Sequence, residues 1–109
     1  MTARLFLLQR ATAAFLVLAV AIHLATILYA IRGGLTAGEI LARTQGNVGF
    51  LAYYSLFVIA VAVHAPIGLR NVLREWLGWR GLSCDGALLL FALVLAGLGL
   101  RAVTALYVA

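Results

Sequence analysis

The chain has 109 residues, of which 66% are hydrophobic and only 10% charged, and its mean hydropathy is +1.15. Soluble domains are about half apolar and a quarter charged, and so short a chain could not bury this much apolar surface in one water-soluble core. The composition therefore favours a membrane protein over a cytosolic enzyme, a nucleic-acid-binding module or a disordered segment. The net charge of +5 indicates no nucleic-acid partner, because the eight arginines are dispersed and no lysine is present. The single cysteine, Cys84, excludes an internal disulfide.

Three apolar stretches, at about 5–31, 48–69 and 86–108, each reach the length of about 20 residues that a helix needs to cross a bilayer. A transmembrane β-barrel would need short segments of alternating hydrophobicity, which this sequence lacks. We therefore predict an all-α fold in which residues 1–109 form a single transmembrane domain, a three-helix bundle of up-down-up topology.

The connection between the first two spans carries a helix-start pattern. Thr36 followed three residues later by Glu39 has the spacing of a capping box, in which each side chain bonds to the backbone N–H of the other residue. The pattern predicts a short helix over about 36–44, lying along the outer surface. A plain connector is the alternative.

The arginines divide unevenly between the two sides of the predicted bundle. The N-terminus and the second connection carry five, and the first connection carries two. Because cytoplasmic loops are enriched in basic residues, this division predicts a cytoplasmic N-terminus. We expect a multi-pass protein of a bacterial-type inner membrane. The five are Arg4, Arg10, Arg70, Arg74 and Arg80, and the two are Arg32 and Arg43.

Two histidines, His23 and His64, lie inside predicted spans, where polar side chains are costly and often functional. At helical spacing each has small residues as neighbours on its own face. This pattern suits a haem, because a flat macrocycle needs an imidazole ligand with little side-chain bulk nearby, and two axial imidazoles give a six-coordinate haem for electron transfer. A hydrogen bond between helices is the alternative, and zinc is disfavoured because carboxylates and thiols are missing nearby.

The segment that begins at His64 carries a more specific pattern: Gly68 and Arg70 follow the histidine, and Glu75 comes after a largely apolar stretch. The segment resembles the second transmembrane helix of the cytochrome b membrane anchor subunit of succinate dehydrogenases and fumarate reductases. That family carries His-x-x-x-Gly-hydrophobic-Arg, an apolar stretch and then an acidic residue. The resemblance implies that His64 is an axial ligand of haem b, with Gly68 and Arg70 in the haem environment. The alternatives are that Gly68 only permits close helix packing and that Arg70 only anchors the helix at the interface.

The start of the first span is similar to a second motif of the same family. Gln9-Arg10-Ala11-Thr12-Ala13 resembles the family's His-Arg-x-Ser-Gly, with Gln9 in place of the histidine and Ala13 in place of the glycine. In the family this Arg and Ser lie beside the quinone, so the resemblance implies a quinone site that uses Arg10 and Thr12. Ordinary anchoring of Arg10 at the inner interface is the alternative.

The resemblance also implies partners. The chain would dock an iron–sulfur subunit and a flavoprotein and pass electrons between them and membrane quinone, as a non-catalytic anchor of an oxidoreductase complex. The expected contact with the iron–sulfur subunit is the cytoplasmic face that carries Arg4, Arg74, Glu75 and Arg80. The alternatives are a haem b anchor of another quinone-linked dehydrogenase and a haem-free structural or assembly membrane protein.

The two histidines are expected at different depths. With Arg10 and Arg70 as markers of the inner surface, His23 lies about 20 Å deep and His64 about 9 Å deep. The difference of roughly 10 Å is too large for one iron, whose axial nitrogens lie about 4 Å apart. We therefore expect two haems for a pair of anchor chains, with the missing ligands supplied by a second copy in a homodimer or, less favoured, by a sister subunit. One haem between His23 and His64 of a single chain is the alternative, if Arg10 lies deeper or the helices are tilted.

Arg101 interrupts the third span. Counted from Gly86 it lies about 22 Å across the bilayer, which is the level expected for His23. We expect its guanidinium to pair with a propionate of the outer haem, because a fixed guanidinium matches a carboxylate. Snorkelling to the outer surface is the alternative.

Overall fold

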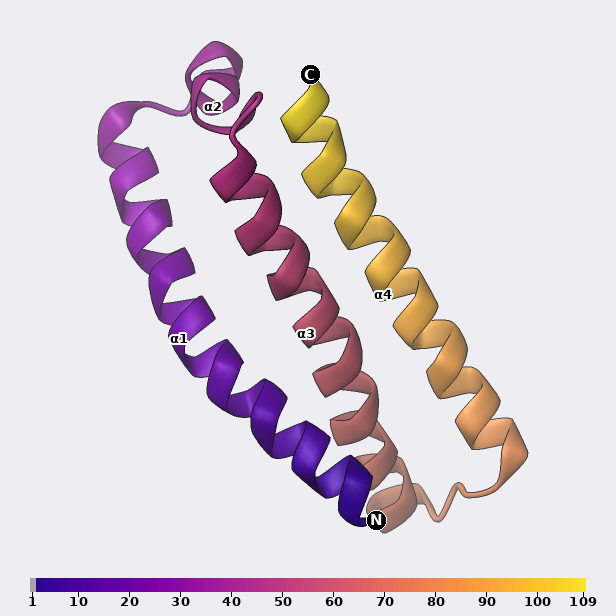
Figure 1. The fold of residues 1–109 in the computed structure, drawn as a ribbon. Helices are drawn as coiled ribbons and strands as arrows, with labels where there is room; N and C mark the ends of the chain where they lie inside the picture. Colours follow the sequence, from indigo (N-terminus) through magenta and orange to yellow (C-terminus); the bar gives the residue numbers. More distant parts are fainter. Residues whose placement is uncertain (1) are drawn as a thin grey trace.

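The computed structural model describes residues 2–109, and it consists of helices with no strand among these residues. Three long helices run antiparallel and lie side by side, and each is long and apolar enough to span a membrane (Figure 1). The fold is the expected all-α three-helix membrane bundle. The elements in chain order are α1 (Ala3–Gly33), α2 (Ala37–Thr44), α3 (Val48–Val72), a π-helical turn η1 (Leu73–Leu77) and α4 (Leu82–Val108).

The bundle has two distinct ends (Figure 1). The N-terminus, η1 and the connection 78–81 lie at one end, which we call the N-terminal end. The short helix α2 and the C-terminus lie at the other, which we call the C-terminal end.

The second and third helices are longer than their apolar stretches. The second was expected to end at 69, but α3 continues to Val72 and runs on as η1 to Leu77. It stops at Gly78, whose left-handed backbone (φ 65°) lets its N–H bond to the carbonyl of Leu73. The start of α4 is Leu82 rather than 86. Helical hydrogen bonding needs no apolar side chains, so these two helices extend past their apolar stretches as far as the glycines at 78 and 81.

The capping box at the start of α2 is confirmed. The hydroxyl of Thr36 accepts from the backbone N–H of Glu39 at 3.2 Å, and the Glu39 carboxylate accepts from the N–H of Thr36 at 3.4 Å. The segment is tied to the end of α4, since the Thr44 hydroxyl donates to the carbonyl of Leu106 and the N–H of Gly46 donates to the carbonyl of Tyr107. This short helix therefore covers the C-terminal end of the bundle.

The helix α3 is the central element, because it packs against both α1 and α4. The two helices α3 and α4 are tightly packed at Gly99, where a β-carbon would lie 2.5 Å from Cγ1 of Val58. The buried positions are mostly small, as expected where helices associate in lipid through close backbone packing. They are Ala19, Thr44, Ala60, Ala62, Pro66, Ile67, Cys84, Leu88 and Val103.

Candidate functional site

His64 lies on α3 and is half-buried, and its Nδ1 is 3.2 Å from the hydroxyl oxygen of Thr12 on α1. A threonine hydroxyl has one proton to donate, and that of Thr12 donates to the backbone carbonyl of Leu8 at 2.8 Å. When the Thr12 proton is on the Leu8 carbonyl, the Thr12 oxygen accepts from the Nδ1–H of His64 and the lone pair of Nε2 is free, which is the tautomer that ligates a metal through Nε2. When the Thr12 proton points at Nδ1, the imidazole proton lies on Nε2 instead.

Gln9 is a third member of this arrangement. A β-carbon on Gly68 would lie 3.3 Å from the amide nitrogen of Gln9, so the space beside Gly68 is taken by a side chain from α1. The amide oxygen of Gln9 is buried and has no hydrogen-bond partner within residues 2–109. Buried polar atoms are nearly always paired, so this oxygen marks a position where a donor is missing.

The sequence did not identify Gln9 as a site residue. A signal was present, because Gln9 lies three residues before Thr12 and therefore on the same helix face. The contact of Thr12 with His64 and that of Gln9 with Gly68 lie on one face of α1, packed against α3.

The second histidine is held by an aromatic cluster. Nδ1 of His23 lies 2.9 Å from the hydroxyl of Tyr54, and its ring packs against the rings of Tyr54 and Phe57 with centroids 5.5 Å apart in each case. Next to it the hydroxyl of Tyr53 donates to the carbonyl of Ala19. The sequence alone assigned neither tyrosine a partner on α1.

His23 also lines an apolar pocket of about 680 Å³ at the C-terminal end of the bundle. The pocket is enclosed by all four helices, with Ile40 contributed by α2 and Val103 by α4. Arg101, expected at this level, is exposed and does not line the pocket.

The two histidines lie at different levels of the bundle. His23 contacts Tyr54, and Tyr54 is ten residues from His64 on the same helix, which is about 15 Å of helix rise. This difference in level between the two histidines exceeds the roughly 10 Å expected from the sequence, with Arg10 and Arg70 as markers of the same depth. Two axial ligands of one iron lie about 4 Å apart, so the two histidines of one chain do not meet at a single metal.

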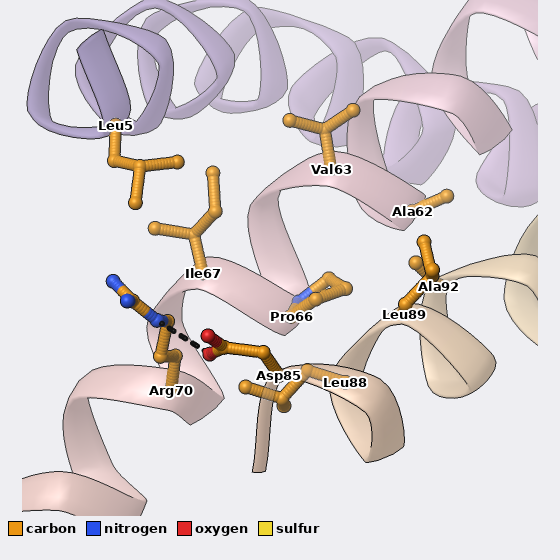
Figure 2. Close-up of a pocket in the computed structure, with 10 residues that line it drawn as sticks. All are labelled: Leu5, Ala62, Val63, Pro66, Ile67, Arg70, Asp85, Leu88, Leu89 and Ala92. Carbon is orange, nitrogen blue, oxygen red and sulfur yellow. Dashed lines mark hydrogen bonds and ion pairs between the residues drawn. The ribbon is translucent and has the colours of Figure 1, made fainter. Parts of the chain in front are cut away.

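Arg70 is engaged within the chain. Its Nε lies 3.2 Å from a carboxylate oxygen of Asp85 at the start of α4, and this pair stands on the wall of a pocket of about 420 Å³ (Figure 2). The pocket lies between α3 and α4, with Leu5 approaching from α1, and His64 is not part of its lining. A propionate at Arg70 would therefore compete with Asp85, a residue that the sequence did not place in the site.

The two residues expected at a quinone do not lie together. Thr12 faces His64, whereas Arg10 is exposed, with its guanidinium carbon 5.6 Å from the ring centroid of Phe6. Residues that are two positions apart on a helix point in directions that differ by about 200°. The side chains of Arg10 and Thr12 therefore leave α1 on nearly opposite faces.

The donor set fits a haem. No group of three or more His, Cys, Asp or Glu side chains lies within metal-binding reach in residues 2–109, so a cage made only of protein ligands is not formed. A haem needs fewer protein ligands, because its iron requires from the protein only an axial imidazole. His64 offers an imidazole whose Nδ1 contacts the Thr12 hydroxyl, so that Nε2 is the nitrogen left for a metal.

The whole chain was compared with known proteins. It matches no protein-family model, no curated protein and no solved structure. The function is therefore argued from its own residues and their geometry.

Proposed function

We propose that this chain is the haem b membrane anchor of a succinate dehydrogenase or fumarate reductase-type complex, which passes electrons between soluble subunits and membrane quinone. One observation carries the proposal: the imidazole of His64 contacts a Thr12 hydroxyl that can accept from Nδ1–H and so leave Nε2 free to bind iron. The spacing of His64, Gly68, Arg70 and Glu75 supports the same assignment.

The residues of α1 orient the imidazole. Metal-bound histidines commonly donate their second ring N–H to a neighbouring oxygen, which fixes the ring and makes the ligand more basic. The Thr12 oxygen is such a partner, and it is itself fixed by bonds to the carbonyls of Leu8 and Gln9. When bound, the haem supplies one-electron redox chemistry.

His23 is proposed as the ligand of a second haem at the other level. The Tyr54 hydroxyl can donate to or accept from Nδ1, because it has a proton and lone pairs. Only when Tyr54 accepts does Nε2 of His23 keep its lone pair. Arg101 would have to turn from its exposed position to reach a propionate of this haem.

A second chain is part of the proposal. Each histidine is half-buried and stands at its own level, so one chain offers one axial ligand per haem. A second copy related by a two-fold axis would supply both missing ligands, which is why a homodimer is favoured over a sister subunit. The iron–sulfur subunit and the flavoprotein would dock at the N-terminal end.

The quinone is proposed to bind at the N-terminal end of α1. Thr12 belongs to the His64 network, and Arg10 lies at the same level on the exposed face of the helix. The unpaired amide oxygen of Gln9 adds a further polar group at this level. Quinone reduction by Arg10→Leu and Thr12→Ala variants, each assembled in the complex, separates the two residues. Unchanged kinetics in both variants exclude this site.

The test is the haem content of the purified chain, measured as pyridine haemochrome and as a reduced-minus-oxidised spectrum. His64→Ala is expected to lose one of two haems, and His23→Ala the other. Leu56→Ala, at an exposed apolar position on α3, is the matched control and should keep both. Full haem content in His64→Ala would overturn the proposal.

A second candidate is a haem-free membrane protein in which both histidines join helices, and the contact of His23 with Tyr54 favours it. That candidate predicts a wild-type protein without haem. The soluble subunits that co-purify with the chain would identify the dehydrogenase. They would distinguish a succinate or fumarate complex from another quinone-linked enzyme.

A further inference from the structure

A polar pocket of about 320 Å³ lies at the N-terminal end of the bundle. It is lined by Asn71 from the end of α3, by Arg74 and Glu75 from η1, and by Arg80 from the connection to α4. It is distinct from the apolar pocket of Figure 2, which Arg70 and Asp85 border.

The arginines of this pocket lack a partner. The Nε of Arg74 is buried and makes no hydrogen bond within residues 2–109. In the same part of the chain the one ion pair is Arg70 with Asp85, so neither Arg74 nor Arg80 is paired with a carboxylate. Arg74 is half-buried, whereas Glu75 and Arg80 are exposed. A buried donor atom without an acceptor is costly, and two guanidinium groups in one pocket repel each other. An anion between them would remove both costs.

The charge of the pocket indicates what kind of anion fits. Two arginines and one glutamate leave a net charge of one positive unit. A group with one negative charge balances the pocket. The Glu75 carboxylate and the Asn71 side chain also favour a ligand that carries hydrogen-bond donors of its own, because a bare anion would be repelled by the carboxylate.

The depth of the pocket indicates where the anion comes from. From Val48, the start of α3, to Arg70 the helix rises about 33 Å, which already covers a hydrocarbon core of about 30 Å. Arg74 lies about 6 Å further along, within the headgroup layer. Trp76 and Trp79, next to the pocket in sequence, are of the type that gathers at this interface.

We infer that this pocket binds the headgroup of a phospholipid with one negative charge and free hydroxyls, such as phosphatidylglycerol. Arg74 and Arg80 bind the phosphodiester, which guanidinium groups hold through paired N–H donors. Glu75 and Asn71 bind the headgroup hydroxyls. The bound lipid fixes η1 and the connection 78–81 to the membrane surface.

The test is native mass spectrometry of the full chain in detergent, titrated with phosphatidylglycerol, phosphatidylcholine or inorganic phosphate. Phosphatidylglycerol should be retained in preference to phosphatidylcholine, which has no headgroup hydroxyls and no net charge. Arg74→Gln and Arg80→Gln should each weaken its binding by about fivefold, as expected for one arginine at a membrane surface. Arg74→Lys should bind the lipid more weakly than the wild type and more tightly than Arg74→Gln, because it keeps the charge and loses the paired donors.

Arg4→Gln is the matched control, since it removes the same charge from an exposed position at the same end of the bundle. It should leave binding unchanged. Equal losses in Arg4→Gln and Arg74→Gln would overturn the site in favour of general attraction to a basic surface. Inorganic phosphate that displaces the lipid at comparable concentration would overturn it in favour of a simple anion site.

A third result separates lipid from protein. If the double variant Arg74→Gln/Arg80→Gln binds phosphatidylglycerol as the wild type does but loses its soluble partner subunits, the pocket is a protein contact and the inference fails. Haem content is measured on the same samples, so failure here is distinguishable from failure of the proposed function.

Discussion

Thr12 and His64 join α1 to α3 through a hydrogen bond of 3.2 Å between a hydroxyl and an imidazole Nδ1. The hydroxyl is itself fixed by the carbonyls of Leu8 and Gln9, at 2.8 and 3.1 Å. The ring of His64 is therefore oriented by the backbone of the neighbouring helix and not only by its own rotamer.

Thr12→Val should weaken haem binding at His64 by about 10-fold to 100-fold, the usual effect of losing the partner of a metal-bound histidine. The substitution keeps the shape and removes the acceptor. The measurement is haem retained per chain after dilution or competition with an apo-protein acceptor. Thr104→Val is the control, because Thr104 makes the same pair of backbone bonds on α4, at 2.8 and 3.1 Å, and contacts no histidine. Equal retention in both variants would show that the Thr12 contact does not support the ligand.

Tyr53→Phe should destabilise the pairing of α1 with α3, because it removes the hydrogen bond to the carbonyl of buried Ala19. Hydrogen bonds between membrane helices contribute about 0.6 kcal/mol on average and up to about 1.7 kcal/mol. The loss is measured by reversible unfolding in mixed micelles. Tyr29→Phe should have no effect, since Tyr29 is 70% exposed and its hydroxyl makes no hydrogen bond in the described part of the chain. A larger loss in Tyr29→Phe would contradict the assignment.

Gly99→Ala should separate α3 from α4. The added methyl would lie 2.5 and 2.9 Å from the two γ-carbons of Val58, and overpacking of this kind costs about 1–3 kcal/mol. Gly97→Ala is the matched control on the same helix, because nothing lies within 4 Å of its added methyl. It should be neutral or stabilising by up to about 1 kcal/mol through helix propensity. The free energies of unfolding of the two variants are measured under the same conditions. Equal values would show that Gly99 is not a tight contact between α3 and α4.

The start of α2 should loosen in acid. Hydrogen bonds from the side chain and backbone of Thr36 hold the pKa of the Glu39 carboxyl below its ordinary value of 4.5. The carboxylate form is thus favoured in the folded helix, so its contribution is complete above the ordinary pKa and is lost as pH falls through the folded value.

Amide hydrogen exchange across residues 36–40, followed as pH is lowered, measures this loss after correction for the intrinsic exchange rate. Glu39→Gln should remove the pH dependence, and Glu75→Gln, at the other end of the bundle, should keep it. A pH dependence that persists in Glu39→Gln would assign it to another group.

The spans and the start of α2 could be predicted from the sequence. Both depend on local properties: the length of an apolar run decides whether a helix can cross a bilayer, and the cap of α2 needs only Thr36 and Glu39, three residues apart. The end of the helix formed by α3 and η1 and the start of α4 could not be predicted from the apolar runs, because glycines beyond those runs, Gly78 and Gly81, set these boundaries.

The two histidines could be selected from the sequence because polar residues are rare inside spans. The hydrogen-bond partners of these histidines could not be predicted from the sequence. Thr12 is 52 residues from His64, and Tyr54 is 31 residues from His23, so each contact depends on the register between two antiparallel helices. A shift of one residue turns a side chain by about 100° and moves it about 1.5 Å along the axis. Side-chain packing between α1 and α3 decides that register, and only the tertiary structure shows that Thr12 faces His64, that Arg10 points away, and that Arg70 meets Asp85.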